Sequence, residues 1–152
     1  MTFPADFRWI GAVVRLLPSG RVDEAFGSGG ISTVPSAAES GYTRGVMTLD
    51  HAATQPDGRL VAAGSQDPLD VHSAADPYVV RLMPNGRPDP SFDHDGRASI
   101  GTSNPVAVLS RPSGDLVVVG WDTEYFGGGY LSLLRVGPGD NDFPRPAQPT
   151  TD

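Results

Sequence analysis

One segment of this chain occurs twice in nearly identical form. Residues 13–26 read VVRLLPSGRVDEAF and residues 79–92 read VVRLMPNGRPDPSF, with nine of the fourteen positions identical. A second pair interleaves with the first, because QPDGRLVAAG at residues 55–64 and RPSGDLVVVG at residues 111–120 share five of ten positions. Repetition of this kind is typical of one supersecondary unit stacked on copies of itself, since a single unit cannot bury its own apolar face. The repeat therefore constrains the architecture much more than the activity.

The spacing of the copies gives the size of one unit. Arg15 and Arg81 are 66 residues apart, whereas Arg81 and Arg135 are 54 residues apart. The period is therefore about 55 residues, with an insertion in the first interval. Residues 27–45 are small, polar and rich in turn formers, so the extra length is expected there, in a surface loop.

Within one period the sequence predicts four short strands joined by tight turns. Pro-Asp-Gly at residues 56–58 and Pro-Asn-Gly at residues 84–86 favour turns, because proline fixes φ and glycine accepts a positive φ. Residues 116–121, LVVVGW, show no polar alternation, as expected of a strand covered on both faces. No segment has sustained helical periodicity. The expected strands are residues 13–17, 31–34, 46–53, 60–63, 78–83, 97–100, 106–109, 116–119 and 131–136.

These strands predict an all-β fold of β-propeller-like, four-stranded antiparallel repeats. The series of two, then four, then three strands amounts to about two and a quarter units, whereas closed propellers have about 4–8 blades. The chain is therefore expected to be incomplete as a closed propeller. A Pro-rich, polar segment at residues 137–152 is expected to be disordered. The predicted repeat domain spans residues 1–136, with units at about 8–34 (partial), 46–100 (full) and 104–136 (partial).

The pattern QPDG–L–V–G, then V–R–L–P–G, then D–F–G–G, resembles the delta-60 repeat of bacterial proteins. The resemblance covers roughly residues 8–135 and is most specific in residues 55–64 and 79–92. It implies a propeller-like repeat in proteins that are mostly secreted or at the cell surface, and it implies no catalytic residues. After residue 135 the pattern decays, because VGPGDNDF keeps the proline but loses the following glycine.

Composition narrows the function classes. A net charge of −7 offers no basic footprint for nucleic acid or an anionic membrane. The absence of cysteine excludes disulfides and thiolate chemistry, and the histidines at positions 51, 72 and 94 have no partner at metal-ligand spacing. No apolar run approaches the roughly 18–20 residues of a membrane span, and the N-terminal residues lack signal-peptide features. We expect neither a nucleic-acid partner nor membrane insertion.

A candidate calcium site lies at Asp89, Asp93 and Asp95. Residues 93–96, D-H-D-G, resemble the start of a calcium loop, in which hard oxygen ligands cluster around a bend made by glycine. The matching positions of the first unit read G-S-G-G, which indicates a turn in which aspartate is an ordinary residue. Thr102 also stands where a distal glutamate is expected. The sequence favours the turn, with a weak Ca²⁺ site as the alternative and no other cofactor.

Charged residues recur in register with the repeat. Arg15, Arg81 and Arg135 each follow two apolar strand residues, and Asp23 and Asp89 come eight residues after the first two. A charge that recurs in every unit is expected to stabilise the unit itself. We therefore expect either an ion pair within each unit or a charge that keeps a strand edge from pairing with another chain. A ligand site is the less favoured interpretation.

Aromatic residues surround the glycines at residues 127–129. Trp121, Tyr125, Phe126 and Tyr130 are typical either of an aromatic-lined ligand loop, as in carbohydrate binders, or of a Gly-rich hairpin whose aromatics anchor a core. The hairpin is favoured. No nucleophile motif accompanies these residues, so an enzyme is not expected.

Two function classes remain. The first is a non-catalytic β-repeat scaffold or binding module of unknown ligand, and the alternative is a small glycan-binding domain or hydrolase-like enzyme with its site at residues 121–130. We expect a homo-oligomer or part of a longer propeller, because unpaired strand edges at residues 13–17 and 131–136 are templates for another chain. The competing outcome is a monomer folded back so that residues 8–17 cover the C-terminal unit.

Overall fold

The computed structural model describes residues 10–34, 45–68, 76–100, 104–123 and 129–137, and every regular element within them is a β-strand. None of these residues forms a helix long and apolar enough to cross a membrane. The strands are β1 (Gly11–Val14), β2 (Ile31–Val34), β3 (Gly45–Met47), β4 (His51–Thr54), β5 (Leu60–Pro68), β6 (Asp76–Leu82), β7 (Arg97–Ser99), β8 (Asn104–Ser110), β9 (Leu116–Thr123) and β10 (Gly129–Val136).

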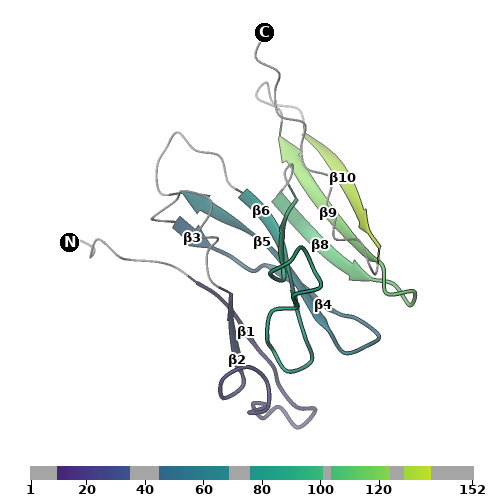
Figure 1. Ribbon diagram of the computed structural model, residues 1–152. Coiled ribbons are helices and arrows are strands. Elements are labelled where there is room, and N and C mark those ends of the chain that lie inside the picture. Colours follow the sequence, from purple (N-terminus) through teal and green to yellow (C-terminus); the bar gives the residue numbers. More distant parts are fainter. Residues whose placement is uncertain (1–9, 35–44, 69–75, 101–103, 124–128, 138–152) are drawn as a thin grey trace, which may run out of the picture.

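The strands form three antiparallel sheets, which stand side by side in chain order in Figure 1. Unit 1 is the pair β1–β2, and unit 3 is the sheet β8–β9–β10. Unit 2 between them is four strands wide, because β3 and β4 lie end to end along one edge of β5, followed by β6 and β7. Within the described residues none of these three sheets closes on itself. The expected all-β fold of four-stranded, propeller-type units is therefore confirmed.

The outer strand of unit 2 departs from the prediction of one continuous strand at residues 46–53. Met47 pairs with Gln66 whereas His51 pairs with Ala63, so the outer strand has one residue more than β5 in this interval. Such an extra residue is a β-bulge, which bends the strand. It is accommodated at Gly64, where a side chain would collide with the carbonyl of Thr48.

Alternation along β5 and β6 builds two separate cores. Val61, Ala63 and Val79 face unit 3. The intervening side chains Ala62 and Val80 face unit 1. Unit 2 is thus covered on both faces, as two packed layers of strands require. The unit 2–unit 3 core consists of Val61, Ala63, Val79, Phe92, Ala98, Ile100, Val108, Leu116, Val118 and Val136, and the unit 1–unit 2 core of Phe26, Val34, Met47, Ala62, Tyr78, Val80 and Leu82.

Two sequence-based expectations are wrong at the ends of this stack. β9 was expected to be covered on both faces, but although Leu116 and Val118 on one face are buried, Val117 and Val119 on the other face are half-buried. A folded-back monomer was the competing arrangement for residues 8–17, but β1 pairs with β2 beside unit 2 and lies at the opposite end of the stack from β10 (Figure 1). The predicted tail at 137–152 lies almost entirely outside the described residues.

Candidate functional site

The loop after β6 holds a buried charge cluster in unit 2. Asp89 accepts hydrogen bonds from Nε of Arg81 (2.9 Å) and Nε of Arg59 (2.7 Å). Ser91 adds two more, from its backbone N–H (3.0 Å) and its hydroxyl (2.7 Å). The Arg81 guanidinium lies 4.6 Å from the centroid of the Phe92 ring. One carboxylate is thus satisfied by two cations and a hydroxyl, and one cation by a carboxylate and an aromatic face.

The electrostatics of Asp89 follow from these contacts. Burial alone raises the pKa of the Asp89 carboxyl, but the hydrogen bonds from Ser91 and Arg59 and the charge of Arg81 outweigh burial and hold its pKa below the ordinary value. Asp89 is therefore ionised at neutral pH and is a structural anion rather than a proton donor. The predicted ion pair within the unit is confirmed here.

Unit 1 repeats the same loop. Nε of Arg15 donates to Asp23 at 2.8 Å, and the Arg15 guanidinium lies 4.6 Å from the Phe26 ring, the same separation as in unit 2. Arg15 also reaches into the next unit, where its Nη1 donates to the carbonyl of Pro84 at 2.6 Å. The recurring arginine therefore holds its own loop and, in unit 1, also ties that unit to unit 2.

Unit 3 achieves charge balance with different residues. The aspartate expected eight residues after Arg135 is replaced by Phe143, and Asp115 stands where unit 2 has Arg59. Nη2 of Arg135 donates to Asp115 at 2.7 Å, and this hydrogen bond lowers the pKa of the Asp115 carboxyl. The negative charge stands in the turn segment just before β9 instead of in the loop after the arginine, so the arginine keeps a partner. This exchange supports a structural role for the recurring arginines.

The three carboxylates of the hypothesised calcium site lie in different surroundings. Asp89 is buried between two arginines, whereas Asp93 is half-buried and Asp95 is exposed. Asp93 and His94 have φ values of 44° and 69°, as in a tight turn, and Oδ1 of Asp95 accepts the backbone N–H of Arg97 at 2.8 Å. Within the described ranges no three histidine or acidic side chains come together as a metal site. Asp89 thus already has the cationic partners that a metal would need to replace, and the weak Ca²⁺ site stays an untested alternative to the turn.

The aromatic loop lies mostly beyond the described residues. Tyr125, Phe126 and the side chain of Tyr130 are outside them. Trp121 is described: it is exposed near the end of β9, and its ring lies over Gly129, where a side chain would collide with it. The structure therefore brings Trp121 against the start of β10, and the glycan-site hypothesis stays a prediction.

A second buried polar group at the face toward unit 1 was not foreseen from the sequence. The guanidinium of Arg97 lies 4.2 Å from the centroid of the Tyr78 ring, and its Nη2 donates to Oε1 of Gln66 at 3.1 Å. The Tyr78 hydroxyl donates to the carbonyl of Thr48 at 2.5 Å. Burial raises the pKa of Tyr78 and lowers that of Arg97. Tyr78 thus joins the bulged outer strand to β6, and Arg97 joins β7 to β5 and β6.

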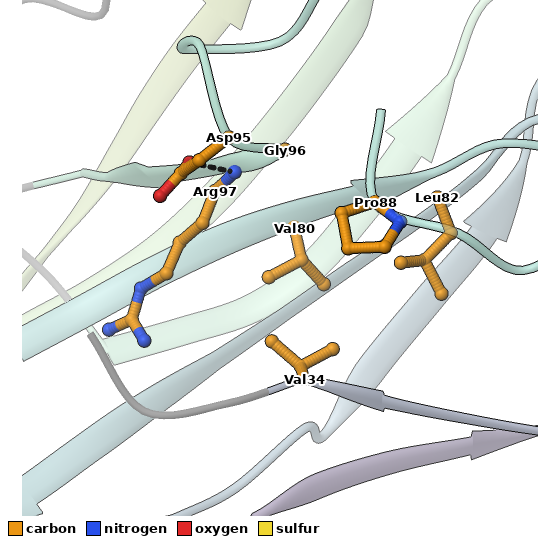
Figure 2. Close-up of a pocket in the computed structure, with 7 residues that line it drawn as sticks. All are labelled: Val34, Val80, Leu82, Pro88, Asp95, Gly96 and Arg97. Atoms are coloured by element: carbon orange, nitrogen blue, oxygen red, sulfur yellow. Dashed lines mark hydrogen bonds between the residues drawn. The ribbon is translucent and has the colours of Figure 1, made fainter. Parts of the chain in front are cut away.

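A small cavity of about 150 Å³ opens between units 1 and 2. Figure 2 shows that the Arg97 guanidinium points away from the other lining residues, so the cavity is mainly apolar. Its size is comparable to a cavity that admits one benzene ring. Asp95 and Arg97 are the two charged residues among those that line it. The lining residues are Val34, Val80, Leu82, Pro88, Asp95, Gly96 and Arg97.

The largest exposed apolar side chains lie on the two outer sheet faces of the stack. We call the outer face of unit 1 the N-end face and the outer face of unit 3 the C-end face. Isolated exposed apolar residues are ordinary, but contiguous ones mark interaction surfaces. The N-end face presents Val14, Leu16, Val22 and Ile31, and the C-end face presents Leu109, Trp121, Leu131 and Leu133.

Comparison with known proteins agrees with this geometry. A protein-family model described as "Domain of unknown function (DUF5122) beta-propeller" matches residues 55–92, which span β5, β6 and the loop with Asp89. A search of curated proteins gives no match. The matched segment is thus the central part of unit 2, and its description carries an architecture without an activity.

Proposed function

We propose that this chain is a non-catalytic β-repeat module that binds other protein units through its N-end and C-end faces. One observation carries the proposal: positions buried in unit 2 are apolar and exposed when they recur at the ends of the stack. Val80 of unit 2 is 1% exposed, and its repeat equivalent Val14 is 52% exposed. Val79 is 0% exposed, and its equivalent Leu133 is 74% exposed.

The charged residues support the same proposal. Those that recur with the repeat bind one another, as Arg81 does with Asp89 and Arg135 with Asp115. A charge that recurs with the repeat and is paired within its own unit serves the stability of that unit. The delta-60 resemblance, which is finer than the matched family description, points in the same direction, since it implies a repeat without catalytic residues.

The experiment measures fluorescence of an apolar dye, anilinonaphthalene sulfonate, in dilute solution of the folded chain. We expect fluorescence enhancement by the native protein and its partial loss in a Leu131→Ser/Leu133→Ser variant, because the N-end face is kept. Thr54→Ser in unit 2 is the matched control. Equal enhancement by all three proteins would overturn the proposal.

The same samples test the glycan-binding alternative. Trp121 is exposed and lies beside the hypothesised loop, so a panel of oligosaccharides is titrated while tryptophan fluorescence is recorded. We expect no saturable change. A saturable change that disappears in Trp121→Phe would favour the glycan-binding domain over the stacking module.

A further inference from the structure

The two interfaces between units within this chain indicate what its end faces bind. At the unit 1–unit 2 interface, the Phe26 loop of unit 1 packs against the tight turn of unit 2. The backbone N–H of Gly27 donates to the carbonyl of Asn85 at 2.8 Å, and the Ser32 hydroxyl donates to the carbonyl of Gly86 at 2.6 Å. Unit 1 packs closely over this turn, because a side chain at Gly86 would lie 2.5 Å from the nitrogen of Gly27.

The equivalent turn of unit 1 is not covered by another unit. Gly20 is the repeat equivalent of Gly86, and the φ values of the two residues are 81° and 82°. A side chain at Gly20 would meet none of the described residues within 4 Å, whereas one at Gly86 would meet unit 1. Leu16 beside this turn is 58% exposed, whereas its equivalent Leu82 is 1% exposed. The N-end face is therefore shaped like the surface of unit 2 that unit 1 covers, with that covering unit removed.

The C-end face resembles the surface of unit 2 that packs against unit 3. Leu133 is equivalent to Val79 and Leu109 is equivalent to Ala53, and in unit 2 these positions contact unit 3. Arg135 is equivalent to Arg15, which ties unit 1 to the Pro84 carbonyl of the next unit. The guanidinium of Arg135 is exposed, and so is Pro18, which matches Pro84 on the N-end face. Residues 116–119, apolar at every position, also have the composition of a strand covered on both faces.

From this repetition we propose that the C-end face of one copy binds the N-end face of a second copy, head to tail, in the geometry of the inner interfaces. This inference rests on the proposed function and names its partner as a second copy of the chain. Two different surfaces meet, so the contact is heterologous, and successive copies build a ring or an open series. The proposal replaces the expectation of pairing between strand edges by a contact between sheet faces.

Two variants test the orientation. Leu16→Glu places a charge on the N-end face alone, and Leu133→Glu places one on the C-end face alone. Both positions are exposed, so neither change disturbs the core. Thr54→Glu, at an exposed position of unit 2 and with the same charge change, is the control. Circular dichroism and urea unfolding are compared first, to establish that all four proteins share the fold.

Light scattering after size exclusion then gives the mass of each sample over a range of concentrations. We expect the wild type and Thr54→Glu to associate increasingly with concentration, and each end-face variant alone to remain at 15.9 kDa. An equimolar mixture of the two variants is expected to form a 1:1 dimer, because each retains the face that the other has lost. Association of Leu16→Glu alone would indicate a symmetric or edge contact and overturn the head-to-tail arrangement. A monomeric wild type would also overturn it, while dye binding would still report separately on the proposed function.

Discussion

Replacing Asp89 with alanine is expected to destabilise the chain far more than the same replacement at Asp23, although the two residues occupy equivalent loops. The Asp89 side chain is 3% exposed and that of Arg81 is 6% exposed, whereas Asp23 and Arg15 are 18% and 33% exposed. Loss of one partner from a buried ion pair costs about 3–5 kcal/mol, because the other charge is left without compensation. A pair in contact with solvent contributes about 1 kcal/mol or less.

The assay is urea unfolding of the wild type and both variants, followed by circular dichroism. The difference of roughly 2–4 kcal/mol between the two replacements, divided by a urea slope of about 2 kcal/mol per M, corresponds to a midpoint lower by about 1–2 M for Asp89→Ala. Both replacements also remove one hydrogen bond to a nearby backbone N–H, so that loss is matched.

A third variant tests whether the lost stability comes from the unpaired charge of Arg81. Arg81→Met in the Asp89→Ala background removes both buried charges and keeps an apolar stem over the Phe92 ring, so we expect most of the lost stability to return. Equal midpoints for Asp89→Ala and Asp23→Ala, or no recovery with Arg81→Met, would refute the reasoning that burial of the cluster sets its energy.

Three further predictions concern the same loops. The pKa of Asp89 is lowered in the folded state, so the stability that its carboxylate contributes is present above about pH 4 and is lost as the pH falls through the folded pKa. The difference in urea midpoint between wild type and Asp89→Asn should therefore be largest near neutral pH and smaller at about pH 3. Gly20→Ala should cost about 1–2 kcal/mol from its positive φ alone, and Gly86→Ala clearly more because of the collision with Gly27; equal melting temperatures would contradict the close packing of unit 1 over the turn at Gly86. Asp93→Gly, which copies Gly27 of unit 1, should stabilise the chain by about 0.5–1 kcal/mol, measured by thermal unfolding, because it relieves a positive φ.

The strands and turns were predictable because their signals are local. Pro-Asn-Gly at residues 84–86 specifies a turn within three residues, and apolar runs of four to seven residues specify strands. The repeat added long-range information, since Arg15 and Arg81 in register with Asp23 and Asp89 indicated an ion pair before any contact was visible. Repetition thus supplied part of the candidate site as well as the fold.

The remaining features depend on contacts between distant residues. Arg59 joins Asp89 from 30 residues away, and the stacking of Arg97 on Tyr78 links β7 to β6. The bulge opposite Gly64 has no local signal other than a glycine inside a strand, which admits several explanations. The end faces look like covered strands in the sequence, because apolar composition does not reveal whether the covering unit belongs to the same copy.

Under the proposed function, repeated apolar sheet faces rather than a polar pocket carry the interactions of this chain. Hydrogen–deuterium exchange of the wild type, at a concentration below and one above the onset of association, tests it most directly. We expect that protection of backbone amides rises together in β1 with its turn at residues 18–20 and in β9–β10, while β5 and β6, already covered on both faces, do not change. Protection that is independent of concentration, or that rises at one end of the stack without the other, would contradict it.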